Sequence, residues 1–209
     1  MCSSDLICVG LQWEAFMTMI EPLASEIPLM VVLGNHERDD PGTGSIGNKD
    51  SGGECGVATS RRFSMPMTAP ANVITYYAYS EGSVAIVMVD SEISIAEGSP
   101  QHTFLTNALR VDRSITPWLV VALHRPVYGE TRNTDFAALE KLFIENKVDL
   151  VLQGHEHDAQ VRLFAVFSLF VSLSLCLTLR RLIRPHVRFL TKIVFQVLIT
   201  LVTMHQCML

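Results

Sequence analysis

The chain has 209 residues, which is enough for one domain with a substantial core, or for one domain with an appended segment. Its 16 basic and 21 acidic side chains give a net charge of −5, and the tail at residues 163–209 holds five of the basic and none of the acidic ones. The body at residues 1–162 is therefore strongly acidic and lacks the basic stripe that nucleic acid requires, so no nucleic-acid partner is expected.

The N-terminal residues, MCSSDLICVG, lack the basic and long apolar regions of a secretory signal. Either the protein is intracellular or the natural start lies upstream of this sequence. The five cysteines show no CxxC spacing, so they predict neither a zinc finger nor a disulfide framework.

Apolar residues at helical spacing predict a helix over residues 13–24, with Pro22 near its end. The apolar run at residues 27–33 breaks at Gly34 and predicts a buried strand that delivers Asn35 and His36 to a site. Residues 39–56, rich in Gly, Asp and Ser, predict a long loop.

Further along the chain, two β-rich runs joined at residues 80–83 predict a hairpin, and residues 101–111 predict a helix. The segment WLVVALH predicts a strand ending at His124, FAALEKLFIENK an amphipathic helix, and VDLVLQGH a strand ending at His155. The sequence thus repeatedly places a histidine where a buried strand ends.

The tail changes character at residue 163. An uncharged, largely apolar stretch at 163–179 is followed by a basic stretch and a shorter apolar one. A membrane-spanning helix needs roughly 17–25 residues, so the length allows one marginal span through residues 163–179, with the basic segment on the cytoplasmic side. The apolar, acid-poor character of the tail favours the competing interpretation, that residues 163–209 are not authentic sequence of this protein.

Three strand-end motifs carry nitrogen and oxygen donors: GNHE at 34–37, HRPVY at 124–128 and GHEH at 154–157. Imidazole suits borderline metals, and amide or carboxylate oxygens complete an open coordination sphere. His155 and His157 are two residues apart, so in an extended segment both rings face one side and reach neighbouring metals about 3.5–4 Å apart. Together the motifs predict a metal site.

In this order, GNHE, HRPxY and GHxH resemble the last three metal motifs of the purple acid phosphatases, members of the calcineurin-like metallophosphoesterase superfamily. The segments DSGGECG and RFSMP and the helix at 13–24 strengthen the resemblance, which covers roughly residues 11–162. It implies an α/β sandwich of two mixed β-sheets flanked by helices, incomplete in this chain because the first strands are missing. Residues 1–162 are the expected partial domain.

The resemblance implies a binuclear centre of Fe(III) with Zn(II), Mn(II) or Fe(II). Asn35, His124 and His155 resemble ligands of the divalent metal, His157 resembles a ligand of the ferric ion, and His36 resembles the histidine beside the bound phosphate. The first aspartate motif of the family is absent from the sequence. Asp5, just upstream of the helix at 13–24, is a weak match to the bridging aspartate of GDxxY, with Cys8 at the tyrosine position; otherwise Asp5 is a solvated residue near the chain start. The iron side is therefore doubtful.

The activity that the resemblance implies is hydrolysis of phosphate monoesters by a metal-bound hydroxide, on a phosphorylated small-molecule or protein substrate. The family is secreted or membrane-associated. The alternative is a catalytically inactive remnant that binds a single metal or phosphate, or is tethered to a membrane. A phosphodiesterase or protein phosphatase that shares GNHE is disfavoured by DSGGECG and HRPxY. The sequence indicates no oligomeric state.

Overall fold

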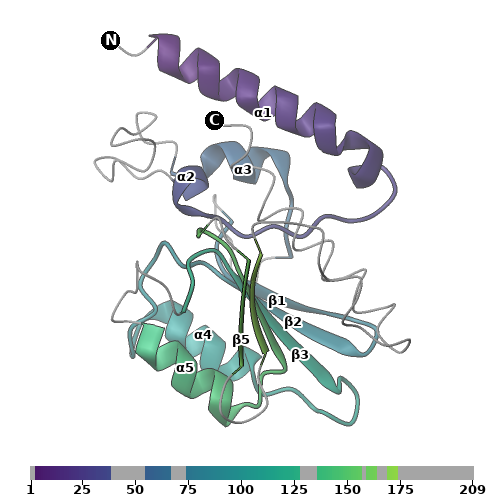
Figure 1. Ribbon diagram of the computed structural model, residues 1–209, viewed down its shortest axis with the longest axis vertical. Coiled ribbons are helices and arrows are strands. Elements are labelled where there is room, and N and C mark those ends of the chain that lie inside the picture. Colours follow the sequence, from purple (N-terminus) through teal and green to yellow (C-terminus); the bar gives the residue numbers. More distant parts are fainter. Residues whose placement is uncertain are drawn as a thin grey trace.

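The computed structural model of the protein describes residues 3–38, 55–66, 74–127, 136–156, 159–163 and 169–173 (Figure 1). Of these, residues 3–9, 136–137, 159–163 and 169–173 are described by their backbone alone. The elements in chain order are α1 (Ser3–Ala24), α2 (Asn35–Arg38), α3 (Val57–Arg62), β1 (Tyr77–Glu81), β2 (Val84–Val89), α4 (Pro100–Ala108), β3 (Trp118–Leu123), α5 (Phe136–Glu145), β4 (Leu150–Gln153), β5 (Ala159–Leu163) and β6 (Leu169–Leu173).

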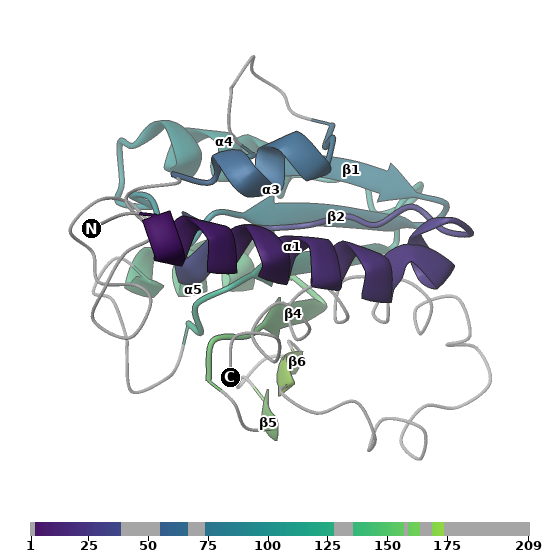
Figure 2. The same ribbon diagram turned by 90° about the horizontal axis from the view of Figure 1, so that it is seen from above.

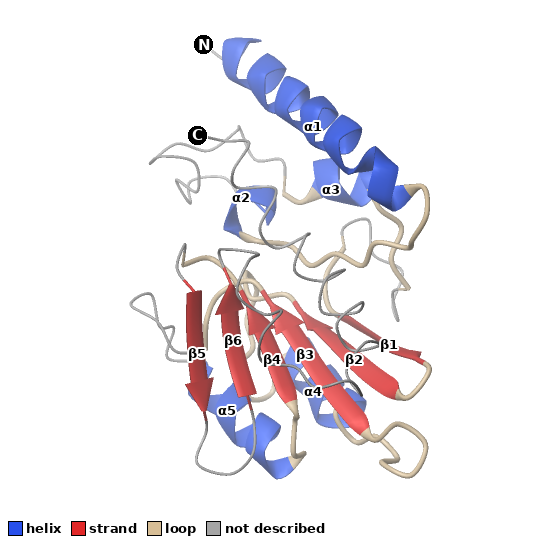
Figure 3. Cartoon of the chain, turned by 45° about the vertical axis from the view of Figure 1, so that its right-hand side comes forward, coloured by secondary structure: helices blue, strands red, loops and turns tan. Residues whose placement is uncertain are grey.

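The strands form one mixed sheet of six, in the order β1-β2-β3-β4-β6-β5. The central strands β2, β3, β4 and β6 are parallel, and the edge strands β1 and β5 each run antiparallel to their neighbour (Figure 3). The predicted α/β class is confirmed. The sequence also predicted a second sheet, to which the described residues contribute no strand.

Both faces of β2, β3 and β4 are buried along most of their length, as expected for parallel strands with cover on either side. Along β2, Ala85, Val87 and Val89 belong to the core shared with the helices, which includes Leu105 of α4 and Phe143 of α5. The alternate residues of β2 belong to a second core on the opposite face. Its strand members are Tyr77, Val84, Ile86, Met88, Val120, Ala122 and Leu152, and residues 31–33 and Ile74 pack with them.

The predicted hairpin is confirmed, because β1 and β2 are joined by Gly82 and Ser83 alone. Gly82 has φ 56°, the left-handed region that tight hairpin turns require and that glycine adopts without strain. The helix predicted at 101–111 is also present, as α4. Ser99 caps it by accepting a hydrogen bond from the His102 N–H at 3.1 Å, and Pro100 occupies its first turn.

Helix α1 lies across the carboxyl end of the sheet (Figure 2). The predicted stripe packs as expected, since Trp13, Phe16 and Ile20 are buried together against Phe63. The helix begins at Ser3, however, ten residues earlier than predicted. Asp5 is therefore a helical residue and does not lie in a segment upstream of the helix, as the match to GDxxY required.

The strand predicted at residues 27–33 is wrong for the described backbone, although residues 31–33 are buried. The Val31 N–H lies 3.3 Å from Sδ of Met65, and the Val31 carbonyl accepts a hydrogen bond from the Tyr77 hydroxyl at 2.7 Å. Because side chains and not a neighbouring strand satisfy Val31, this apolar run is a core segment outside the sheet.

Part of the tail is also in the sheet. Strand β5 crosses the predicted boundary at residue 162, and β6 pairs in parallel with β4. Among the described residues, no helix has the length and apolar character to cross a membrane. The rest of residues 163–179 lies outside the described residues, and so does most of the loop predicted at 39–56.

Candidate metal half-site

Three loops meet beyond the carboxyl ends of the parallel strands, where α2 also lies (Figure 3). Asn35 begins α2 immediately after the buried segment 31–34, His124 follows β3 directly, and His155 lies two residues after β4. Adjacent parallel strands end at the same edge of a sheet, so β3 and β4 bring their histidines together. The Gly154 N–H donates to the His124 carbonyl at 2.9 Å and ties the two loops to each other.

The side chains of Asn35, His124 and His155 converge on one point. Nε2 of His124 lies 2.8 Å from Oδ1 of Asn35 and 3.2 Å from Nδ1 of His155, and Nδ1 of His155 lies 3.1 Å from Oδ1 of Asn35. The two rings are nearly perpendicular, with centroids 5.1 Å apart. Three donor atoms this close to one another suit a single ion with bonds of about 2.0–2.2 Å to nitrogen and oxygen.

The chemistry of this donor set fits a borderline divalent metal, because two imidazole nitrogens and one amide oxygen leave other coordination positions open. Among the residues that the structure describes, no three His, Cys, Asp or Glu side chains form a possible metal cluster. The third donor here is the amide of Asn35. The arrangement is therefore a half-site that needs water, substrate or a further residue to complete it.

Gly34 allows α2 to approach His124 closely. A Cβ at this position would lie 2.7 Å from Oε2 of Glu37 and 2.8 Å from Nδ1 of His124, closer than real side chains pack. The Gly34 N–H donates to Oε2 of Glu37 at 3.1 Å, which fixes the buried carboxyl group under the first turn of α2. The glycine of GNHE is thus required for steric reasons.

Glu37 is a site residue that the sequence did not predict. Burial raises its pKa to about 7, hydrogen bonds from its own N–H and from Gly34 act in the opposite direction, and the charge of Glu92 raises it further. The sequence feature that could have indicated Glu37 is the carboxylate that follows Asn35 and His36 in GNHE. Its burial depends on contacts between distant loops, and the motif alone gives no information on those contacts.

His155 has an unusual backbone conformation. Its φ is 70°, and the Glu156 N–H donates to the Gly154 carbonyl at 2.9 Å across a three-residue turn centred on His155. A non-glycine residue in this region is strained, and such strain concentrates at functional sites. The prediction that His155 lies in an extended segment is therefore wrong, because the turn directs its ring toward Asn35 and His124.

A second cluster lies beside the half-site, on the loop that follows β2. Asp90 is fixed through its backbone, since its N–H donates to Oε1 of Gln101 and its carbonyl accepts from Nε2 of Gln101, each at 2.9 Å. Arg38 of α2 lies 3.7 Å from the Asp90 carboxylate, and Arg125, next to His124, pairs with Glu92. The charges in this cluster are paired.

The structure thus brings together three of the six predicted site residues: Asn35, His124 and His155. His36 follows Asn35 in α2 with its Nδ1 atom buried, and it is not part of the triangle. His157 lies outside the described residues, and of Asp5 only the backbone is described. The roles predicted for His36, His157 and Asp5 stay predictions.

Comparison with known proteins gives one family. Residues 2–159 match the model of the calcineurin-like phosphoesterase family. "Probable inactive purple acid phosphatase 9" of Arabidopsis thaliana is 39% identical over 170 residues, which cover 69% of this chain and 26% of the relative. "Probable inactive purple acid phosphatase 27" of the same organism is 38% identical over 161 residues, which cover 70% of this chain and 26% of the relative.

Among solved structures, the purple acid phosphatase PPD1 from yellow lupin (Lupinus luteus) seeds superposes with a TM-score of 0.66 at 31% identity. The match covers 77% of this chain and 33% of the lupin chain. The chain therefore spans about a quarter of the length of the two Arabidopsis relatives and shares the fold of the lupin enzyme over most of its own length.

Proposed function

Since the chain belongs to the calcineurin-like phosphoesterase family, we propose that it holds a divalent metal ion on Asn35, His124 and His155 and acts in the hydrolysis of phosphate monoesters. The observation that carries the proposal is the triangle of donor atoms, with sides of 2.8, 3.1 and 3.2 Å. Its members lie at the start of α2 and on the loops after β3 and β4, separated in sequence by 89 and 31 residues, and the fold alone brings them together.

A metal ion bound there would supply a Lewis acid for a phosphoryl oxygen and for the attacking water. The chain's own residues would position the phosphate and the metal ligands. His36, next to Asn35, is proposed to donate a proton or hydrogen bond to the phosphate, where charge develops. Glu37 accepts the Gly34 N–H and so fixes the turn that presents Asn35 to the two histidines.

The second metal is a finer proposal. By family resemblance the centre pairs Fe(III) with Zn(II), Mn(II) or Fe(II), and His157 and Asp5 are the proposed residues on the iron side. We propose a phosphorylated small molecule or protein as the substrate. The acidic body of the chain has no basic stripe, so the phosphate has to be held by metal and local donors.

A second candidate function is a domain that binds one metal ion or phosphate without turning over an ester. Two relatives at 39% and 38% identity have names that include "probable inactive". The triangle provides ligands for a single ion, which is compatible with binding and no catalysis.

Hydrolysis of a chromogenic phosphate monoester by the full chain, loaded with zinc or manganese in the presence of iron, tests the first function. We expect metal-dependent turnover. Loss of a residue that only supports a metal ligand typically reduces activity roughly 10–100-fold, so His155→Ala, which removes a ligand itself, should reduce turnover by more than that. His102→Ala is the matched control, because His102 lies in α4 outside the triangle. Metal binding without turnover would favour the second function, and a chain that binds no metal would contradict both metal-dependent versions.

A further inference from the structure

Arg125, the residue after His124, is held in one orientation by the loop after β2. Its Nε lies 2.9 Å from both carboxylate oxygens of Glu92, and its backbone N–H donates to Oγ of Ser91 at 3.0 Å. The Ser91 hydroxyl in turn donates to Oε1 of Glu92 at 3.0 Å. Three residues therefore close a ring of hydrogen bonds, and the guanidinium group is fixed before any ligand arrives.

This ring uses only one of the five N–H groups of the guanidinium. Within the part of the chain that the structure describes, the terminal nitrogens Nη1 and Nη2 donate to no protein acceptor, and the Arg125 side chain is 28% exposed. The Glu92 side chain that pairs with it is only 8% exposed. Among the described residues, the carboxylate engages the guanidinium only through Nε, so none of them occupies the four remaining N–H groups, which can face a ligand.

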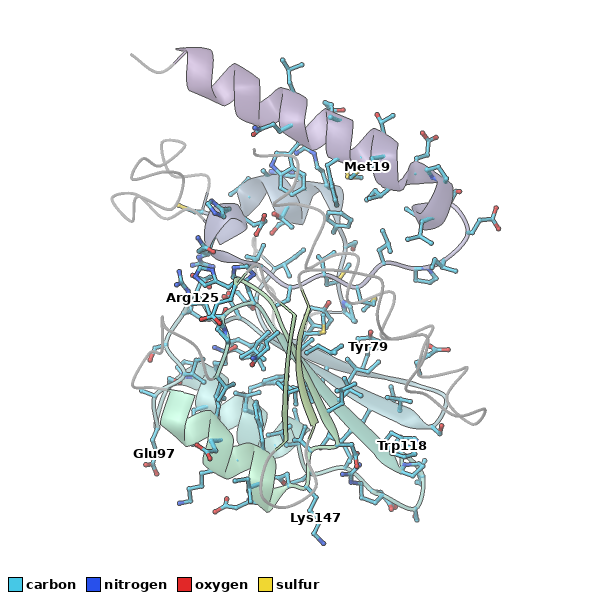
Figure 4. The ribbon with its side chains drawn as sticks, viewed as in Figure 1. Met19, Tyr79, Glu97, Trp118, Arg125 and Lys147 are labelled. Atoms are coloured by element: carbon cyan, nitrogen blue, oxygen red, sulfur yellow. The ribbon has the colours of Figure 1, made fainter. Side chains whose placement is uncertain are left out.

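The guanidinium lies beside the half-site. The charge of Glu92 acts on Glu37 in α2, and Arg38 of α2 pairs with Asp90 on the loop that carries Glu92. Figure 4 shows Arg125 close to α2, at the end of the sheet where the triangle lies. A ligand group next to one bound at Asn35, His124 and His155 therefore has Arg125 as a neighbouring donor.

The local charges indicate what kind of donor Arg125 is. The carboxylates of Glu92 and Asp90 offset the charges of Arg125 and Arg38, so the cluster offers little general attraction for anions. The contribution of Arg125 is therefore the geometry of its hydrogen bonds, since a fixed, planar set of N–H groups matches two oxygens of a phosphate. Such a donor discriminates between ligands by whether they place an oxyanion at one particular position.

We propose that Arg125 is a specificity-determining residue that binds a second phosphate group of the substrate, adjacent to the phosphate held at the half-site. This rests on the proposed function, because it needs the first phosphate to be bound through Asn35, His124 and His155. The substrate class is then a phosphate ester or anhydride with two neighbouring phosphates. Glu92 and Ser91 are positioning residues for the Arg125 fork.

Binding of inorganic pyrophosphate and orthophosphate to the full chain, loaded with zinc or manganese, tests this proposal by calorimetry. We expect tighter binding of pyrophosphate than of orthophosphate. Arg125→Met should weaken pyrophosphate binding about tenfold or more, the usual effect of losing a charge-assisted hydrogen-bonded pair, and should weaken orthophosphate binding much less. Arg110→Met is the matched control, because Arg110 is an exposed arginine between α4 and β3, and it should leave the preference for pyrophosphate intact.

The other possible results distinguish failure of the Arg125 proposal from failure of the proposed metal site. Equal affinity of the wild type for both anions, or an equal loss for both in Arg125→Met, would overturn the role of Arg125 in specificity while leaving the metal site standing. A wild type that takes up neither zinc nor manganese would overturn the proposed function, and this proposal with it. If Arg125→Met does not fold, Arg125→Lys replaces it; lysine keeps the charge but not the bidentate fork, so the loss should again be larger for pyrophosphate.

Discussion

At the scale of single residues, the half-site depends on how closely α2 approaches His124. Gly34 permits that approach, since a Cβ there would come within 3 Å of both Glu37 and the His124 ring. His155 contributes through a backbone conformation that few non-glycine residues adopt. Both residues determine the positions of the metal-binding atoms, so their substitution should change metal affinity.

Gly34→Ala should lower metal affinity and the free energy of unfolding, because the new methyl group pushes Glu37 and His124 apart at a cost of about 1–3 kcal/mol. Chemical denaturation and a zinc titration measure the two effects. Gly10→Ala is the control, since a Cβ at Gly10, inside α1, meets nothing within 4 Å. That variant should gain up to about 1 kcal/mol from helix propensity and keep its metal affinity. Unchanged metal affinity in Gly34→Ala would contradict the role assigned to the glycine.

The site was predictable from the sequence only in part. Asn35, His124 and His155 were found because each follows a buried apolar run, and such runs end at a common edge. Glu37, Glu92 and Arg125 were not assigned a role. Arg125 and Glu92 pair across 33 residues of sequence, and the burial of Glu37 depends on loops that are distant along the chain. Sequence periodicity reports which face of an element is buried and gives no information on which loops touch.

At the scale of elements, the segment at residues 27–34 carries Asn35 to the site without being a strand. Its attachment to the sheet is the buried hydroxyl of Tyr77 in β1, which donates to the Val31 carbonyl at 2.7 Å. Burial raises the pKa of that hydroxyl, so it stays protonated and remains a donor. The sequence predicted a strand here because a buried strand and a buried core segment have the same apolar composition.

Tyr77→Phe should destabilise the fold by about 1–2 kcal/mol, because the Val31 carbonyl loses its hydrogen bond in a buried position. Metal affinity should fall as well, since the segment before Asn35 loses its attachment. Tyr79→Phe is the matched control: Tyr79 also lies in β1, and none of the described residues forms a hydrogen bond with its hydroxyl. Equal stability of the two variants in urea denaturation would show that the Tyr77 hydroxyl does not anchor the segment.

Helix α4 offers a test of local structure away from the site. Ser99→Ala removes the side-chain cap on the His102 N–H and should cost about 1 kcal/mol. Thr103→Ala changes an exposed hydroxyl within the same helix and should be neutral or slightly stabilising, because alanine is the better helix former. Thermal unfolding measures both, and a Ser99→Ala variant as stable as wild type would mean that the cap adds nothing.

At the scale of the whole molecule, the sequence predicted β2, β3 and β4, but it predicted neither the start of α1 at Ser3 nor strand β6. Strands β2 and β3 are apolar runs whose alternate residues enter two different cores, and their burial follows from composition. Strand β6 comes from a segment whose apolar length is equally compatible with a membrane helix. Its place between β4 and β5 depends on tertiary contacts, which the local sequence does not specify.

Removal of residues 164–209 should therefore destabilise the domain. The deletion takes away β6, which pairs with both β4 and β5, and leaves two strand edges unpaired. We expect the melting temperature to fall by about 5 °C or more, corresponding to a few kcal/mol at this chain length. An unchanged melting temperature would instead support a boundary at residue 162 and a tail independent of the sheet.

The central claim is that Asn35, His124 and His155 form one metal site, and the most direct measurement is the zinc or manganese content of the full chain after equilibrium dialysis. The wild type should retain at least one ion per chain. Asn35→Ala, His124→Ala and His155→Ala should each lose one ion, whereas His102→Ala should lose none. Retention of the same metal content by all three variants would contradict the claim.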